Sequence, residues 1–132
     1  MLRILLVEDS PSMRRFARTA LEATRHELGD IEVVEATSGF DALRWLPRGK
    51  YDLVVTDINM PDVNGLELVR FIRQSAAHKS VPIVLISTQS SDRDRHRGLD
   101  LGANAYLAKP FAAEELAREA ILQIASASNT NG

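Results

Sequence analysis

The feature of this 132-residue sequence that most restricts its fold is a fivefold alternation between short apolar runs and longer amphipathic segments. The runs are rich in Val, Ile and Leu and are nearly continuous, which is typical of strands buried on both faces of a parallel sheet. The pattern therefore predicts an α/β domain of type (βα)5, in which helices cover both faces of a five-stranded parallel sheet as a three-layer sandwich. The predicted strands cover residues 2–7, 31–36, 52–56, 81–87 and 105–108.

The segments between the runs carry helix signals. The last one, residues 113–124, has the most regular apolar stripe. Residues 91–101 contain Gly98 and few apolar anchors, and because helices gain most of their stability from a packed face, we expect this fourth helix to be loosely held. The predicted starts of the first three helices, each with a capping residue, are Ser10-Pro11, Ser38 with Asp41, and Asn64-Gly65.

Composition excludes several classes of protein. The absence of Cys excludes disulfides and thiolate metal sites and fits a cytoplasmic location. A net charge of −2 gives no reason to expect nucleic acid or a membrane surface as a partner, and no run approaches spanning length. The length suits one domain, which we place at residues 1–124, followed by a small polar segment, 125–132, as a flexible tail.

Chemically versatile side chains follow four of the five predicted strands. Each alone has an ordinary explanation as a solvated loop residue or a helix cap. Because the carboxyl ends of parallel strands meet at one edge of the sheet, we expect these side chains to converge there. They are Glu8 and Asp9 after the first strand, Asp57 after the third, Ser87 and Thr88 after the fourth, and Lys109 after the fifth.

Three converging carboxylates repel one another, and a hard divalent cation with oxygen ligands relieves that repulsion. Mg²⁺ fits the acidic trio Glu8, Asp9 and Asp57, with the main-chain carbonyl of Asn59 as a further ligand. Lys109 would supply a positive charge for an anionic group, and Ser87 a hydroxyl. With a carboxylate as the nucleophile, the group that the site is expected to accept is a phosphoryl group.

The motifs "LLVEDS" (5–10), "TDINMPDVNG" (56–65), "LIST" (85–88) and "AYLAKPF" (105–111) resemble the receiver domain of bacterial response regulators. The resemblance covers residues 2–124 and is strongest to single-domain, CheY-like chemotaxis regulators. It implies the flavodoxin-like strand order 2-1-3-4-5. It also implies a phosphorylation-dependent signalling switch of a two-component system or phosphorelay.

The resemblance implies a role for each site residue. Asp57 matches the phosphoacceptor. Glu8 and Asp9 match the metal-binding acidic pair. Asp57 and the Asn59 carbonyl complete the ligands of Mg²⁺, with Mn²⁺ as an alternative ion. Ser87 matches the switch hydroxyl and Tyr106 the aromatic residue that packs inward after it. Lys109 matches the lysine that contacts the phosphoryl group, before a cis Lys109–Pro110 bond. Gly65 matches a turn glycine with positive φ.

The resemblance also implies partners. A sensor histidine kinase or phosphotransfer protein would supply the phosphoryl group. An effector would bind the face formed by the fourth helix, the fifth strand and the last helix, and the chain would be a monomer or a phosphorylation-driven dimer. The only catalysis expected is self-phosphorylation and slow self-hydrolysis, tuned by Asn59 and Gln89.

Two departures from the family pattern leave alternatives open. Thr88 stands where a small residue follows the switch hydroxyl, so either Ser87 or Thr88 is available, and the strand register favours Ser87. The fourth helix is polar, either as a solvated helix or as a basic patch for an acidic partner surface. The basic side chains on this helix are Arg93, Arg95, His96 and Arg97.

Two other functional classes fit less well. A turnover phosphatase of the haloacid dehalogenase type needs a second acid two residues after its nucleophile, and that position is Asn59, which cannot transfer a proton. A flavodoxin needs a hydroxyl- and glycine-rich phosphate loop after its first strand. Here that loop is "EDSPS", residues 8–12, whose two acids repel phosphate.

Overall fold

The computed structural model describes residues 1–88 and 92–129 and shows one five-stranded sheet in the order β2-β1-β3-β4-β5, in which all neighbouring strands are parallel. The expected fold class and strand order are therefore confirmed. Gln89, an expected modulator, lies outside the described residues. The strands are β1 (Leu2–Val7), β2 (Ile31–Ala36), β3 (Leu53–Asp57), β4 (Ile83–Ser87) and β5 (Ala105–Ala108).

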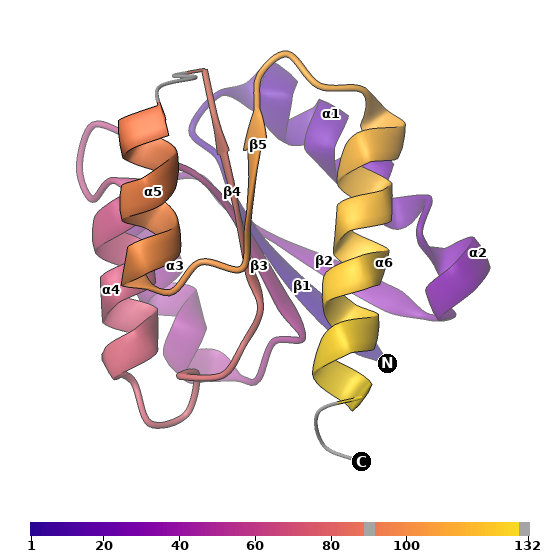
Figure 1. The fold of residues 1–132 in the computed structure, drawn as a ribbon. Helices are drawn as coiled ribbons and strands as arrows, with labels where there is room; N and C mark the ends of the chain where they lie inside the picture. The colour runs from indigo at the N-terminus through magenta and orange to yellow at the C-terminus, as the bar shows by residue number, and fades with distance from the viewer. Residues whose placement is uncertain (89–91, 130–132) are drawn as a thin grey trace.

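Helices cover both faces of the sheet. Helices α3, α4 and α5 lie on one face, and α1, α2 and α6 lie on the other, as Figure 1 shows. None of the helices within residues 1–88 and 92–129 is long and apolar enough to cross a membrane. Their bounds are α1 (Pro11–Glu22), α2 (Arg25–Leu28), α3 (Gly39–Trp45), a 3-10 turn (Leu46–Arg48), α4 (Gly65–Gln74), α5 (Asp92–Leu101) and α6 (Ala113–Asn129).

The central strands supply core on both sides of the sheet, which explains their continuous apolar runs. Alternate residues of β1 point to opposite faces: Leu5 packs with the α3 and α4 side, whereas Ile4 and Leu6 pack with the α1 and α6 side. All five residues of β3 and of β4 are buried. A sheet covered on both faces leaves its strand ends as the places where polar chemistry can reach solvent.

The predicted helix starts are present. Ser10 Oγ accepts the Met13 N–H at 3.4 Å. Asn64 forms a full capping box with Glu67, at 2.9 Å and 3.2 Å. The N-terminus of α3 differs in detail, because Ser38 accepts the Asp41 N–H at 3.0 Å but the Asp41 carboxylate bonds the N–H of Thr37 rather than that of Ser38.

Helix α5, the fourth predicted helix, is very polar, and among its residues only Gly98 is buried. A Cβ built on Gly98 would lie 2.5 Å from Leu85 Cδ1, so the glycine lets the helix approach the sheet closely. Gly98 therefore gives α5 a packing contact that a larger residue would obstruct. That α5 is loosely held stays a prediction.

The last helix extends beyond its predicted end. Helix α6 continues to Asn129, so residues 125–129 of the expected flexible tail are helical. The extension follows from the burial of Ile124, which anchors the turn that precedes it, and from Ala125 and Ala127, which favour helix. The start of β1 and the end of α6 both lie at the amino edge of the sheet, the edge where the parallel strands begin (Figure 1).

Candidate functional site

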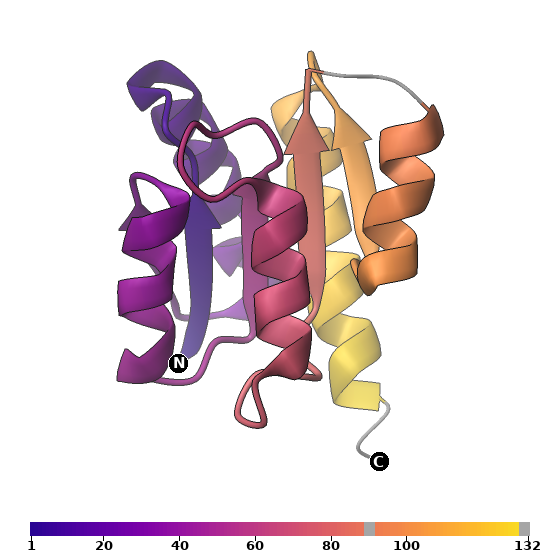
Figure 2. The ribbon, with the colours of Figure 1, turned by 90° about the vertical axis from the view of Figure 1, so that its left-hand side faces the viewer.

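The predicted site residues come together at the carboxyl edge of the sheet, toward which the strand arrows point in Figure 2. Asp57 is the last residue of β3 and Ser87 the last of β4, while Glu8 and Lys109 each follow the end of a strand. The register pairs Asp57 with Ile86 and Ser87 with Ala108, which places the ends of β3, β4 and β5 at neighbouring levels. Side chains separated by up to about a hundred residues in sequence therefore share one edge.

Glu8, Asp9 and Asp57 form an acidic cluster, defined by one carboxylate oxygen from each, all within 4.8 Å of one another. The two deeper members are buried, with exposed fractions of 0% for Glu8 and 4% for Asp57. Asp9 is exposed. A bound cation would thus contact two buried carboxylates, those of Glu8 and Asp57, and one exposed carboxylate, that of Asp9.

Lys109 reaches into the acidic cluster from the end of β5. Its Nζ donates to Glu8 Oε1 at 3.1 Å and to Asp57 Oδ2 at 3.0 Å. Burial alone would lower the pKa of Lys109, but the hydrogen bonds that its ammonium donates to Asp57 and Glu8 outweigh the effect of burial, so that the pKa is raised. Lys109 therefore stays positively charged beside Asp57.

One ammonium does not neutralise the acidic cluster. The pKa of Glu8 is raised, chiefly by burial and further by the charge of Asp57, against the lowering effects of the Ser10 N–H and Lys109. Two carboxylates remain in excess of the single lysine, and all the candidate ligand atoms are oxygens. This donor set fits a hard divalent cation such as Mg²⁺ or Mn²⁺, which prefers carboxylate and water ligands.

Ser87 and Asn59 are linked across the site. The Asn59 side-chain amide donates to Ser87 Oγ at 3.2 Å, and its main-chain N–H donates to Asp57 Oδ1 at 3.1 Å. Ser87 is fully buried, whereas Thr88 is exposed. This difference favours Ser87 as the hydroxyl beside Asp57. The role of the Asn59 carbonyl as a metal ligand stays a prediction.

The fifth strand carries the remaining residues of the predicted set. Tyr106 is half-buried and packs against the core cluster under α3 and α4. The peptide bond between Lys109 and Pro110 is cis, as predicted. Phe111 follows it, and its ring lies 5.8 Å from that of Phe16 on α1, centroid to centroid.

Gly65 opens α4 as expected, but the reason predicted for it is wrong. Positive φ occurs only at Gly29 and Gly102 among the described residues. Instead, a Cβ on Gly65 would lie 2.3 Å from the carbonyl oxygen of Asp57 and 2.8 Å from the Cα of Ile58. The glycine allows α4 to begin directly against the chain at Asp57 and Ile58, where the Gly65 N–H donates to the Ile58 carbonyl at 2.9 Å.

Asp62 is a residue of the site loop whose role the sequence analysis missed. Its carboxylate accepts the N–H groups of Gly39 at 3.3 Å and Phe40 at 3.0 Å, so that it caps the first turn of α3. The capped helix is distant in sequence, and for that reason no local motif reveals the contact. The contact ties the loop after Asp57 to the neighbouring helix.

Substitution Asp62→Ala is expected to lower the free energy of unfolding at pH 7 by at most about 1 kcal/mol, because the carboxylate is exposed. The Phe40 N–H lowers the pKa of Asp62. A carboxylate whose pKa is lower in the folded state than in the unfolded state stabilises the fold at pH values above its unfolded-state pKa. This stabilisation is lost as the pH falls through the folded-state pKa. Urea unfolding from pH 7 to pH 2.5 should therefore show the difference between wild type and variant shrinking with acid. A constant difference would contradict a charge-assisted cap.

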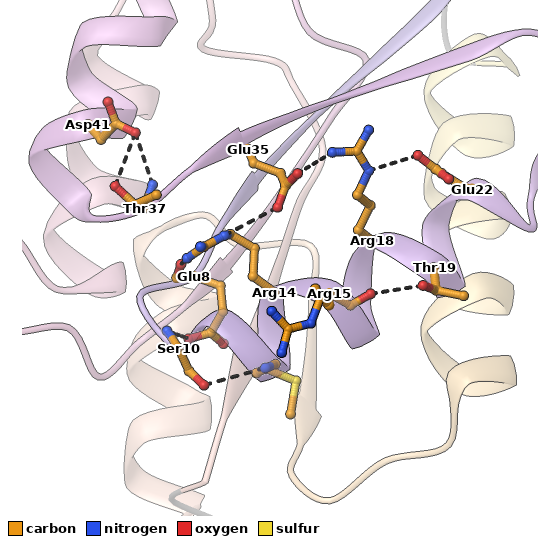
Figure 3. Close-up of polar contacts among 11 residues, drawn as sticks. Glu8, Ser10, Arg14, Arg15, Arg18, Thr19, Glu22, Glu35, Thr37 and Asp41 are labelled. Carbon is orange, nitrogen blue, oxygen red and sulfur yellow. Dashed lines mark hydrogen bonds and ion pairs between the residues drawn. The ribbon is translucent and has the colours of Figure 1, made fainter.

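Arg14 is a second residue that the sequence analysis missed. Figure 3 shows its guanidinium between the turn at Glu8 and the side chain of Glu35 on β2. Its Nη1 donates to the Glu8 carbonyl at 2.9 Å, and its Nε lies 3.2 Å from Glu35 Oε1. Two acids, Glu32 and Glu35, interrupt the apolar residues of β2, but the sequence does not indicate which of them would pair with α1.

The parallel (βα)5 sheet and the acidic edge define an α/β domain with an acidic cluster at its strand ends that suits a divalent cation. The family model for the response regulator receiver domain matches residues 4–121. The chain belongs to the response regulator receiver family. Members of this family are the signalling switches of two-component systems, in which sensor histidine kinases are the partners.

Individual relatives agree with this assignment. The chain is 40% identical over 117 residues to the KDP operon transcriptional regulatory protein KdpE of Escherichia coli. The aligned region covers 88% of this chain and 48% of KdpE. The chemotaxis response regulator CheY4 of Vibrio cholerae superposes with a TM-score of 0.78 at 30% identity, covering 94% of this chain and 98% of CheY4. The chain spans between 15% and 49% of the length of the first curated relatives.

A metal-bound neighbour is also similar. The Mn²⁺-bound form of the response regulator Rcp1 superposes with a TM-score of 0.77 at 26% identity, over 91% of this chain and 89% of that chain. In the present chain, the acidic cluster supplies oxygen ligands suited to such an ion.

Proposed function

We propose that this chain is a phosphorylation-dependent switch that accepts a phosphoryl group on Asp57 from the phosphohistidine of a sensor histidine kinase or phosphotransfer protein. The observation that carries the proposal is the position of Lys109, whose ammonium bridges the buried carboxylates of Glu8 and Asp57. It places a fixed positive charge beside the carboxylate best situated to act as a nucleophile at a strand end.

The chemistry follows from the groups around Asp57. A carboxylate oxygen of Asp57 forms a bond to phosphorus as the P–N bond to the donor histidine breaks, and the bonding electron pair leaves with the imidazole. Lys109 stabilises the negative charge on the phosphoryl oxygens. Glu8, Asp9 and Asp57 would hold Mg²⁺, with the Asn59 carbonyl as a further ligand, and the ion supplies additional charge neutralisation when bound.

The same site supports a switch rather than a turnover enzyme. Asn59 stands where a turnover phosphatase needs an acid, and its amide is committed to Ser87. On phosphorylation, Ser87 would turn toward the phosphoryl group and Tyr106 would pack further inward, shifting an existing equilibrium between two conformations. Slow self-hydrolysis, with Asn59, Thr88 and Gln89 as modulators, would reset the switch.

The output would be binding of an effector protein to the face formed by α5, β5 and α6. Arg93, Arg95, His96 and Arg97 on α5 are all exposed, which suits a contact with an acidic partner surface. Phosphorylation-driven dimerisation through the same face is the alternative output. Charge reversal at Arg93, Arg95 and Arg97 should weaken effector binding in a salt-dependent manner if the basic patch is used.

Incubation with acetyl phosphate and Mg²⁺ is expected to add one phosphoryl group, detected by intact mass spectrometry as an acid-stable, base-labile adduct. Because the acidic cluster needs a cation to offset its excess charge, chelation with EDTA should reduce the adduct to background, and Mn²⁺ should restore it. The absence of any adduct with Mg²⁺ present would contradict the proposal. An adduct that persists in EDTA would contradict the role of the metal.

A further inference from the structure

Arg14 contacts the acidic turn through the main chain rather than through a carboxylate. It lies in the first turn of α1, with 19% of its side chain exposed, and it donates to the carbonyl of Glu8 at 2.9 Å. That carbonyl belongs to the peptide group joining Glu8 to Asp9. Arg14 therefore holds the one peptide plane that sets the directions of both acidic side chains.

The guanidinium is itself held in place. Glu35, at the end of β2, pairs with Arg14 and also with Arg18, which pairs in turn with Glu22 at 2.8 Å. Figure 3 shows these four side chains as a continuous chain of alternating charge along α1 and β2. Arg18 shares Glu35 with Arg14, and its drawn contacts go to Glu22 and Glu35 rather than to the acidic turn.

The turn is fixed from its other sides as well. The Glu8 N–H donates to the Ala36 carbonyl on β2 at 3.1 Å, and the Ser10 N–H donates to Glu8 Oε2 at 3.1 Å. Arg14 satisfies the Glu8 carbonyl, which lies beyond the last register pair of β1 and β2, Val7 with Ala36. Without Arg14, the Glu8–Asp9 peptide would lose the hydrogen bond that fixes its rotation.

We propose that Arg14 is a positioning residue for the divalent-cation site: it fixes the Glu8–Asp9 peptide so that both carboxylates face Asp57. This inference rests on the proposed metal site. The net charge of Arg14 repels a cation, so charge and geometry act in opposite directions. Loss of the charge strengthens cation binding, whereas loss of the geometry weakens it, and the sign of the measured change separates the two.

The test is Mg²⁺ binding to the full, unphosphorylated chain, measured by isothermal titration calorimetry for wild type, Arg14→Gln and Arg18→Gln. Both variants lose one positive charge and one ion pair with Glu35, but only Arg14→Gln loses the hydrogen bond to Glu8. We expect Arg14→Gln to bind Mg²⁺ about tenfold more weakly than wild type, the order seen when the supports of metal ligands are removed. Arg18→Gln should bind as tightly as wild type or more tightly.

Thermal unfolding in metal-free buffer provides the structural control, since each variant loses its ion pair with Glu35 and one further contact, to the Glu8 carbonyl for Arg14 and to Glu22 for Arg18. Arg14→Lys keeps the charge and tests the geometry in a variant that retains an ion pair. One ammonium cannot bond Glu8 and Glu35 in the forked manner of a guanidinium. The Mg²⁺ affinity of Arg14→Lys should therefore fall between that of the wild type and that of Arg14→Gln.

Equal Mg²⁺ affinities for Arg14→Gln and Arg18→Gln would overturn the positioning role and leave the metal site intact. If Arg14→Gln fails to fold, Arg14→Lys provides the test. An Mg²⁺ affinity of Arg14→Lys equal to that of the wild type would then overturn the positioning role. Absence of Mg²⁺ binding by the wild type would overturn both this inference and the metal-dependent part of the proposed function. Weaker Mg²⁺ binding by Arg14→Gln but not by Arg18→Gln, when the two variants are equally stable, supports the positioning role of Arg14.

Discussion

Substitution Asp57→Asn is expected to reduce phosphorylation by acetyl phosphate to background, because an amide lacks the nucleophilic carboxylate oxygen. The same change should raise the free energy of unfolding of the metal-free protein by on the order of 1 kcal/mol. The charge of Asp57 helps to raise the pKa of Glu8, so its removal leaves Glu8 paired with Lys109 alone. Intact mass spectrometry and urea unfolding followed by Trp45, the single tryptophan, measure the two effects.

Asp9→Asn is the matched control for Asp57→Asn. It removes a carboxylate from the same acidic cluster but keeps Asp57, the proposed acceptor, so the adduct should still form at raised Mg²⁺ concentrations. Full phosphorylation of Asp57→Asn would place the acceptor elsewhere in the chain. A fall in stability on Asp57→Asn would show that the bond from Asp57 to Lys109 outweighs the repulsion among the carboxylates.

Gly65→Ala is expected to destabilise the fold by about 3 kcal/mol, since the added methyl group would meet main-chain atoms that cannot rotate away. The contacts are the carbonyl oxygen of Asp57 at 2.3 Å and the Cα of Ile58 at 2.8 Å. Relief requires the start of α4 to move away from the end of β3, so the orientation of the Asp57 carboxylate should change as well. We expect weaker Mg²⁺ binding together with a lower urea midpoint.

Gly49→Ala supplies the comparison for Gly65→Ala. Its Cβ would meet only the guanidinium of Arg3, the far end of a flexible side chain, and its backbone is extended at φ 169°. We expect a change within about 0.5 kcal/mol. Similar losses for the two variants would attribute the effect to glycine replacement in general and would contradict the close-approach explanation for Gly65.

The sheet could be predicted from sequence because burial on both faces leaves a strong local mark. Every predicted strand is present within two residues of its predicted ends, and the largest difference is the start of β4 at Ile83 rather than residue 81. The edge residues could be placed for the same reason, since a strand that is correctly located also locates the residue after it. Short α2 (Arg25–Leu28), which buries no residue, left no comparable apolar pattern.

Contacts between distant polar side chains could not be predicted. Asp62 caps a helix that starts 23 residues earlier in the chain, and Arg14 reaches main chain and Glu35 together. Neither contact produces a periodic or local signal. The unequal burial of Glu8 and Asp9 was also hidden, because adjacent residues at a strand end differ only in the side of the turn to which they point.

The positions of Met1 and of the end of α6 have a practical consequence for measurement. Met1 is 84% exposed, and α6 ends at the same edge of the sheet, opposite the acidic cluster (Figure 1). A tether attached at Met1 would orient the acidic cluster away from a sensor surface, with α5 and β5 accessible from the side. Immobilised chains could therefore be loaded with metal and phosphoryl donor and screened against candidate partners on one chip.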